Sequence, residues 1–312
     1  MMQSYNKDTK LIFFLGPHFG VLFLRLMKRH YDFLNYKVIT YSNKSDSYYG
    51  YESVPAYCTE NHIDFLDVSV EKRSLLQTCI SFKPSIVICG FYARILPIRI
   101  VDLPPGGAYN VHPGKLPKYR GPFPTAWAIL NNEDSFGITI HRMEREIDTG
   151  PICVQKCFPI LPEETGYELY LRSMRLSAEV LCSSIPSLLD KSFAVTEQRE
   201  MGSYYGRIPS HHHIDWSNTS RQIKNLVRVH SKPYFPVYSF VKNKILLINR
   251  CTIDHNVHFR LQGPGKVIET PDQAGFPVTC GDGVIQVTDY EVCPTGAAEV
   301  KTVSLWKGLQ LN

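Results

Sequence analysis

The sequence predicts an α/β protein with a doubly wound, mostly parallel sheet, followed by a small strand-rich region. In the first two thirds of the chain, short apolar strands alternate with helical runs, which is typical of such sheets. One of these strands, Ser85–Gly90, is an almost continuous apolar run, as in parallel strands that are buried on both faces. After a polar linker at Met201–Ser210, short strands with turn signals predict a small barrel. We therefore expect one domain over residues 1–207 and a second over residues 208–312.

Composition and charge are those of a globular protein. The chain has 312 residues, of which 44% are hydrophobic and 20% charged, and its formal net charge is +5. This charge suits an anionic substrate but is too small for a dedicated nucleic-acid binder. The nine cysteines are odd in number and contain no Cys-x-x-Cys pair, which favours reduced thiols in a cytoplasmic protein over disulfides or a zinc site.

The apolar run near the N-terminus is interpreted as a buried first strand. Leu11–Leu15 follows Lys7 and Lys10, as in a signal peptide, but Gly16-Pro17-His18 interrupts the run and no convincing cleavage site follows. Nowhere does the chain approach the roughly 20 apolar residues of a membrane span. We therefore expect no membrane association.

The predicted elements of the first domain follow in order. Strands are expected at Leu11–Leu15, Lys37–Thr40, Phe65–Val68, Ser85–Gly90 and Gly137–His141. Helices are expected at Val21–His30, Val54–Asn61, Leu75–Ser81 and Trp127–Leu130. The turn after the first strand lacks the Gly-x-Gly-x-x-Gly pattern, so a dinucleotide site is not indicated. Ligands of such sheets bind at the carboxyl ends of strands, where Gly90–Pro97 and Asn110–His112 are expected.

A long amphipathic helix and a strand-rich region complete the prediction. Thr165 can cap the helix, whose apolar stripe recurs at three- to four-residue spacing: Leu169, Met174, Ala178, Leu181, Ile185 and Leu188. A short helix is expected at Ser220–His230. Strands are expected at Tyr238–Val241, Ile245–Asn249, Gly265–Glu269, Pro277–Cys280 and Val284–Thr288. Gly281-Asp282-Gly283 predicts a tight hairpin turn between the last two.

Three residues carry the strongest chemical signal. Asn110 and His112 are two positions apart, so on a strand both side chains project from the same face. Asp148 follows His112 by 36 residues, and the intervening helix and strand would bring the chain back to it. Taken singly, an Asn is usually a turn former, a His a structural residue and Asp-Thr-Gly a loop. Together, an amide donor, a titratable base and a carboxylate form a mechanistic set for acyl transfer to an amine.

These residues carry a family resemblance. Asn110-Val111-His112, Leu116–Gly121 and Ile147-Asp148-Thr149-Gly150 resemble the motifs of the N10-formyltetrahydrofolate-dependent formyltransferases. The resemblance extends to Gly90–Pro97 and to His213–Ser217, and so covers most of the chain. It implies the formyltransferase fold with an OB-like C-terminal domain.

The resemblance also implies roles for the three residues. Asn110 would donate its amide N–H to the formyl oxygen, and His112 would handle the proton that leaves the amine. Asp148 would favour the charged imidazole and raise the pKa of His112. The folate pterin would lie against the backbone of Arg94-Ile95-Leu96 and the loop Glu144-Arg145-Glu146-Ile147-Asp148. No metal is implied, and we interpret His211-His212-His213 as a solvated linker rather than a metal site.

The sequence signal is weaker for the residues that would contact the acceptor substrate. Lys115 and Arg120 are candidates for contact with a sugar diphosphate, although a solvent-facing lysine is the default for Lys115. The Tyr-rich loop at Tyr41–Tyr51 is either a solvated surface or, through Tyr49, a platform for a base. Two departures from the family pattern occur. Gly114-Lys115 stands where Ser-Leu is common, and Pro122 stands where some sugar-specific relatives carry Arg.

We expect an N-formyltransferase that uses N10-formyltetrahydrofolate to formylate the amine of a UDP- or dTDP-linked amino sugar. The segments Arg207–Trp216 and Pro233–Pro236 resemble aminoarabinose-type sugar formyltransferases. A methionyl-tRNA formyltransferase is the alternative substrate class, but the stretch at Tyr41–Ser47 lacks the basic insertion of those enzymes. Residues 208–312 carry eleven Lys and Arg against eight Asp and Glu, so no concentrated basic track for nucleic acid is indicated. A homodimer is compatible with the sequence.

Two further function classes remain open. A formyltetrahydrofolate hydrolase would use water in place of the amine, and Asn110 argues against it because the matching position in that class is usually aliphatic. A catalytically idle folate-binding module is disfavoured by the intact set of Asn110, His112 and Asp148.

Overall fold

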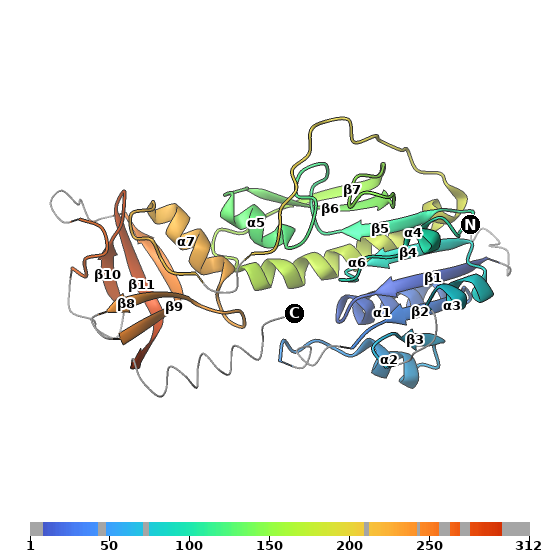
Figure 1. Ribbon diagram of the computed structural model, residues 1–312, viewed down its shortest axis with the longest axis horizontal. Helices are drawn as coiled ribbons and strands as arrows, with labels where there is room; N and C mark the ends of the chain where they lie inside the picture. The colour runs from blue at the N-terminus through green and yellow to red at the C-terminus, as the bar shows by residue number, and fades with distance from the viewer. Residues whose placement is uncertain are drawn as a thin grey trace. The chain divides into compact units, whose positions relative to one another are not determined.

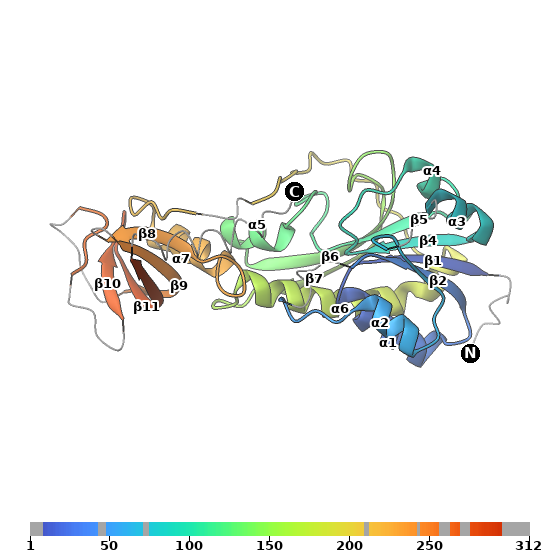
Figure 2. The ribbon, with the colours of Figure 1, turned by 60° about the horizontal axis from the view of Figure 1, so that its bottom comes forward.

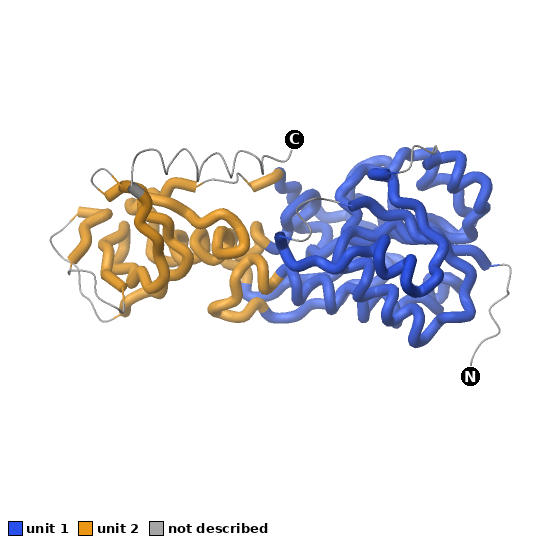
Figure 3. Tube along the Cα trace, turned by 90° about the horizontal axis from the view of Figure 1, so that it is seen from below, with its two compact units in different colours: residues 1–125, 134–159, 170–206 blue, residues 126–133, 160–169, 207–312 orange. Residues whose placement is uncertain are grey.

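The computed structural model describes residues 9–42, 48–70, 75–208, 212–241, 244–255, 263–268 and 275–294. The chain forms two compact units, each built round its own sheet (Figure 3). Unit 1 comprises residues 1–125, 134–159 and 170–206, and unit 2 comprises residues 126–133, 160–169 and 207–312. The domain boundary predicted at residue 207 stays a prediction.

Unit 1 is built round a seven-stranded sheet in the order β3-β2-β1-β4-β5-β6-β7. The strands are β1 Lys10–Leu15, β2 Asn35–Thr40, β3 Phe65–Asp67, β4 Ile86–Gly90, β5 Ala108–His112, β6 Ser135–Arg142 and β7 Ile152–Pro159. The first five are parallel, β6 runs antiparallel to β5, and β7 antiparallel to β6. The predicted mostly parallel, doubly wound sheet is therefore confirmed; strand β7 was not predicted.

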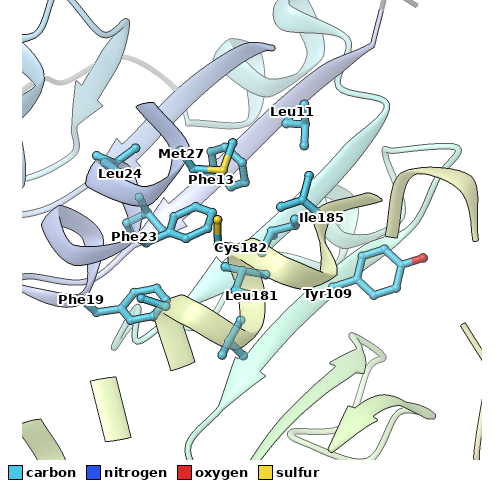
Figure 4. Packing of buried hydrophobic residues seen from close by; sticks show 14 of the residues in the cluster. Leu11, Phe13, Phe19, Phe23, Leu24, Met27, Tyr109, Leu181, Cys182 and Ile185 are labelled. Carbon is cyan, nitrogen blue, oxygen red and sulfur yellow. The ribbon is translucent and has the colours of Figure 1, made fainter. Parts of the chain in front are cut away.

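Helices cover both faces of this sheet (Figures 1 and 2). They are α1 Phe19–Tyr31, α2 Val54–Glu60, α3 Leu75–Phe82, α4 Ile98–Val101 and, from residue 170 onward, α6 Gly166–Asp190. Helix α5 Pro124–Leu130 lies mostly within unit 2. Alternate residues of β1 point to opposite faces. Phe13 packs in a cluster with residues of α1, α2 and α6, whereas Phe14 packs with residues of α3 and α4. Figure 4 shows residues of the first cluster, among them Leu181 and Ile185 of α6 and Phe23 of α1.

The long helix α6 begins as predicted. The Thr165 hydroxyl accepts a hydrogen bond from the backbone N–H of Glu168 (3.2 Å), whose carboxylate accepts one from the Thr165 N–H (2.9 Å), which forms a capping box. All six residues of the predicted stripe are buried. Among the described residues, no helix is both long and apolar enough to cross a membrane.

Unit 2 contains helix α7 Ser220–Val229 and a four-stranded antiparallel sheet in the order β10-β11-β9-β8, curled into a half-barrel. Its strands are β8 Val237–Val241, β9 Lys244–Asp254, β10 Phe276–Thr279 and β11 Val284–Pro294. The predicted hairpin turn joins β10 and β11. In place of the expected strand Gly265–Glu269, the described residues 265–268 form only an isolated bridge, Val267 with Val278. Gly265 has φ +81°, a turn conformation that interrupts an extended strand.

Candidate active site

The site is built on the two strands where the sheet changes direction. Asn110 and His112 lie on β5, and the antiparallel register places Asn110 opposite His141 and His112 opposite Thr139 on β6. Directly opposed residues project from the same face of a sheet. Thr139, His141 and His112 are buried. The face therefore carries four polar side chains next to each other.

Asp148 meets this face from the loop that follows β6. Its carboxylate Oδ2 lies 3.4 Å from Nδ1 of His112, and its Oδ1 accepts a hydrogen bond of 3.3 Å from Nδ2 of Asn110. Helix α5 and strand β6 return the chain, and the structure brings the three residues together; their catalytic roles stay a prediction. Asp148 has φ +57°, a left-handed conformation that is uncommon for a residue with a side chain.

Both ring nitrogens of His112 face hydrogen-bond acceptors. Nε2 lies 2.7 Å from the carbonyl oxygen of Tyr119, and Nδ1 faces Asp148. Because a carbonyl can only accept, Nε2 carries the hydrogen and Nδ1 is the atom that gains or loses a proton. Burial lowers the pKa of His112, although the Asp148 carboxylate and the Tyr119 carbonyl oppose that shift. Asp148 thus acts on this pKa in the expected direction, but desolvation is the larger effect and lowers the net pKa.

Asp148 remains ionised in the site. Burial by itself would raise the pKa of its carboxyl group, but His112, His141 and the Gly121 N–H together hold that pKa well below its ordinary value. The Gly121 N–H donates to Oδ2 at 2.9 Å. A fixed negative charge thus lies beside the titrating nitrogen of His112.

His141 is part of the site but was not predicted from the sequence. Its Nδ1 lies 2.7 Å from the carbonyl oxygen of Arg142, so Nδ1 carries a hydrogen. Its Nε2 lies 3.2 Å from Nδ2 of Asn110 and 3.4 Å from Oδ1 of Asp148. The two amide hydrogens of Asn110 are in this way directed at His141 and Asp148.

A second polar network holds the loop that follows β5. The Thr139 hydroxyl donates to the Gly114 carbonyl at 2.7 Å, and Gln155 Nε2 donates to the Leu116 carbonyl at 2.9 Å. A Cβ atom at position 114 would lie 2.5 Å from Nε2 of His112, closer than real Cβ contacts. Glycine, where the family commonly has serine, is therefore required by this conformation of the loop.

The two segments expected to bind folate are exposed. Ile95 is 82% exposed, and the backbones of Ile95 and Leu96 make no hydrogen bond within the described part of the chain. The Leu96 side chain is buried in the cluster against which Met143 packs. Met143 precedes the loop residues Glu144, Arg145, Glu146 and Ile147, all exposed. Both segments thus adjoin one apolar cluster.

The candidate phosphate contacts differ in their surroundings. Lys115 is exposed. Arg120 is half-buried, and its Nε and one terminal nitrogen donate to Oε1 of Gln198, at 3.2 and 2.8 Å. Arg120 is thus already paired within unit 1, whereas Lys115 faces solvent.

The tyrosines of the Tyr-rich loop stack on one another. The ring of Tyr49 lies 5.5 Å from that of Tyr51 at an interplanar angle of 30°, and the Tyr51 ring is stacked at 5.5 Å on His18. Tyr48 contacts Tyr49 edge-on and is 61% exposed. Of this loop, residues 43–47, which include most of the stretch compared with the tRNA-specific insertion, lie outside the described residues.

The described residues hold no group of three His, Cys, Asp or Glu side chains that could bind a metal ion. In the expected linker His211-His212-His213, His211 lies outside the described residues, and the ring of His213 packs against Tyr238 and Phe240.

Comparison with known proteins agrees with the geometry. Residues 12–185 match the formyl transferase family, and residues 208–310 match its C-terminal domain. The chain belongs to the formyl transferase family. This formyl transferase is 29% identical over 290 residues to the methionyl-tRNA formyltransferase of Caldanaerobacter subterraneus subsp. tengcongensis, covering 90% of this chain and 92% of the relative.

Two solved structures share its fold. An N-formyltransferase from Helicobacter canadensis, in complex with folinic acid and dTDP-3-aminofucose, superposes with a TM-score of 0.71 at 24% identity, covering 91% of this chain and 100% of the other. WlaRD, a sugar 3N-formyl transferase in the presence of dTDP and 5-N-formyl-THF, gives a TM-score of 0.71 at 22% identity, with 91% and 98% covered. The predicted family, enzyme class and fold are confirmed.

Proposed function

We propose that this formyl transferase formylates the amine of a nucleotide-linked amino sugar, with N10-formyltetrahydrofolate as the formyl donor. The observation that carries the chemistry is the convergence of Asn110, His112 and Asp148 on one buried face of the sheet. The set supplies a donor for a developing oxyanion, a group that moves a proton, and a fixed carboxylate.

Asn110 stabilises the negative charge that develops on the formyl oxygen. Negative charge grows on that oxygen as the amine attacks, and an amide N–H directed at it lowers the barrier. The two hydrogen bonds that Nδ2 makes, to His141 at 3.2 Å and to Asp148 at 3.3 Å, are long. A formyl oxygen can replace one of them while the other keeps the amide oriented.

His112 handles the proton. Burial lowers the pKa of His112, so the ring is neutral at pH 7 and its Nδ1 can accept the proton that the attacking amine loses. Asp148, ionised and 3.4 Å away, then stabilises the imidazolium, which gives the proton to the folate N10 atom as the bond between N10 and the formyl carbon breaks. The hydrogen bond between Nε2 and the Tyr119 carbonyl keeps the ring in the tautomer that leaves Nδ1 available.

The folate segments fit a flat heterocycle with polar edges. The co-substrate supplies the formyl group on its N10 atom. The backbones of Ile95 and Leu96, together with the loop Glu144–Asp148, offer hydrogen-bonding groups beside exposed apolar side chains. Ile95 and Ile147, 82% and 46% exposed, would cover the faces of the ring. Such a mixture is usual in ligand sites.

An amino-sugar nucleotide is the acceptor that the surface charges favour. A sugar diphosphate needs few positive groups, and we assign them to Lys115 and Arg120, with the base stacking on Tyr49. The methionyl-tRNA relative supports a second candidate, initiator tRNA. The modest charge of residues 208–312 argues against it, because binding many phosphates needs a concentrated basic track.

The test is a product assay with three acceptors. The enzyme is incubated with N10-formyltetrahydrofolate and dTDP-3-aminofucose, a UDP-linked aminoarabinose or methionyl-tRNA, and products are identified by mass spectrometry. We expect formylation of an amino-sugar nucleotide only. Efficient turnover of methionyl-tRNA that falls steeply with salt would replace the sugar proposal, and formate release without any amine would indicate a hydrolase.

A further inference from the structure

A segment outside the predicted site crosses the two loops that surround His112. We call residues 196–205 the strap. It is attached at one end by an antiparallel bridge between Ile152 and Thr196, and at the other by a parallel bridge between Arg120 and Tyr204. Residues 194–201 are exposed except for Gln198, which is half-buried. The strap therefore directs a single side chain of this stretch inward.

The carboxamide of Gln198 is engaged at both of its ends. Its Nε2 donates to the carbonyl oxygens of Asp148 and Gly150, at 3.0 and 2.6 Å. Its Oε1 accepts from Nε and a terminal nitrogen of Arg120, at 3.2 and 2.8 Å. One side chain thus joins the loop at residues 146–150 to the loop at residues 116–121.

These two loops supply the partners of His112. The second loop provides the Tyr119 carbonyl that accepts from Nε2, and the first provides the Asp148 carboxylate that faces Nδ1. The Gly121 N–H also crosses from one loop to the other, donating to Asp148. The separation of the two loops consequently sets how far each of these two partners lies from the imidazole ring of His112.

The backbone of the strap fixes the second loop but not the first. The Arg120 N–H donates to the Ser203 carbonyl, the Tyr205 N–H donates to the Arg120 carbonyl, and the Tyr119 N–H donates to the Ser203 hydroxyl, at 2.9 to 3.0 Å. The bond from the strap to the carbonyl of Asp148, a residue with φ +57°, comes from the Gln198 side chain. Left-handed residues persist only when their surroundings hold them.

We propose that Gln198 is a positioning residue for formyl transfer, whose carboxamide fixes Asp148 and the Tyr119 loop on opposite sides of His112. This inference rests on the proposed roles of His112 and Asp148. Gln198 itself touches none of the reacting atoms. It acts by holding the Asp148 carboxylate in place beside the His112 imidazole. Displacements near 1 Å in such groups lower the rate about a hundredfold.

Two substitutions distinguish the contribution of the carboxamide oxygen from that of the nitrogen. Gln198→Leu removes the hydrogen bonds of both atoms. Gln198→Glu keeps an acceptor for Arg120 but places a carboxylate oxygen against the carbonyls of Asp148 and Gly150. The matched control is Gln222→Leu, which removes a glutamine that bonds the backbone N–H of Thr219 at the start of α7 in unit 2.

The experiment has a kinetic and a spectroscopic arm. Formylation of dTDP-3-aminofucose is measured with the full chain, and the ring of His112 is titrated by NMR, with its signal assigned from His112→Ala. For both Gln198 variants we expect kcat to fall about ten- to a hundredfold, with little change in the KM for formyltetrahydrofolate. The titration midpoint of His112 should move in both variants. Gln222→Leu should change neither quantity.

Several outcomes would overturn the inference. A wild-type kcat and His112 titration in Gln198→Leu would mean that the glutamine is only structural. Normal kinetics in Gln198→Glu with loss in Gln198→Leu would assign the effect to Arg120 instead. If His112→Ala turned over normally, the proposed catalytic set would fail and the role of Gln198 with it. If the wild type did not formylate the sugar nucleotide, the acceptor proposal would fail, and the His112 titration would still decide the role of Gln198.

Discussion

The proposed catalytic face and the two segments proposed to bind folate are organised in opposite ways. On the catalytic face, Asn110, His112 and Asp148 make hydrogen bonds or close polar contacts within the chain. In the folate segments, Ile95 and Ile147 project into solvent and the backbone of Leu96 is available. The first region is set before any ligand arrives, whereas the second is completed only by a ligand.

The difference indicates how free energy is distributed in this enzyme. A prearranged donor and base need no reorganisation at the moment of reaction, which is the largest source of transition-state stabilisation in many enzymes. Exposed apolar side chains at the folate segments gain free energy when a ligand covers them. Substitutions on the catalytic face should therefore lower kcat, and those in the folate segments should raise the KM for folate.

The strongest way to break this comparison is to remove the oxyanion donor. Asn110→Ala should lower kcat about a hundred- to a thousandfold, because one lost donor costs roughly 2.7–4 kcal/mol of barrier. The affinity for folinic acid, measured by calorimetry, should be nearly unchanged. Asn61→Ala, at the half-buried C-cap of α2, is the control and should leave kcat unchanged. A near-normal kcat in Asn110→Ala would remove this residue from the mechanism.

A smaller loss is expected from displacing His112 without replacing it. The new Cβ atom of Gly114→Ala would lie 2.5 Å from Nε2 of His112, so the ring or the loop must shift. We expect kcat to fall about ten- to a hundredfold. Gly206→Ala, where a Cβ meets no atom within 4 Å, should keep wild-type kinetics. Equal kinetics in the two variants would show that the loop tolerates the shift.

The pH profile tests the neutral state of His112. Burial lowers the pKa of His112 below its ordinary 6.5. As the pH is lowered, kcat/KM should therefore stay constant through pH 6.5 and decrease, about tenfold per pH unit, only below that lowered pKa. The unfolded chain binds this proton more readily, so the free energy of unfolding should also decrease as the pH falls below 6.5. His112→Gln should flatten that decrease. An acidic limb above pH 6.5 would contradict the argument.

The smallest effect is expected in the folate segments. Ile95→Ala should raise the KM for formyltetrahydrofolate about four- to fifteenfold, as expected for the loss of one to two buried methylene groups at about 0.8 kcal/mol each. Because Ile95 is 82% exposed without ligand, the melting temperature should not change. Val70→Ala, at 75% exposure, is the control. A changed kcat with an unchanged KM would contradict the proposal that these segments act on folate binding alone.

Much of the fold was predictable because its elements follow strong periodic patterns. The parallel strands are continuous apolar runs, and the stripe of α6 repeats at helical spacing, so both were recognised. Strand β7 was missed because only Cys153 of its eight residues is fully buried, which leaves little apolar pattern to detect. The bridge at Val267 was mistaken for a strand because local composition does not report the turn at Gly265.

The residues of the proposed site that have a recognisable sequence spacing were predictable. Those that reach the site only through the fold were not. Asn110, His112 and Asp148 have a recognisable spacing. His141 lies in an apolar strand and gives no signal until the register of β5 and β6 is known. Gln198 lies in a polar segment that resembles any surface loop. The net pKa of His112 could not be predicted either, because burial, which dominates it, is a property of the folded chain.

The register between β5 and β6 also makes enzymatic activity a test of correct strand pairing. Asn110 faces His141 and His112 faces Thr139 because β6 pairs in one alignment. A slip of one residue would turn His141 and Thr139 to the opposite side of the sheet. Misaligned molecules could keep most of their strand hydrogen bonds and yet lack the support for Asn110. In a refolding experiment, recovered turnover would therefore report correct alignment more sensitively than circular dichroism, which records only strand content.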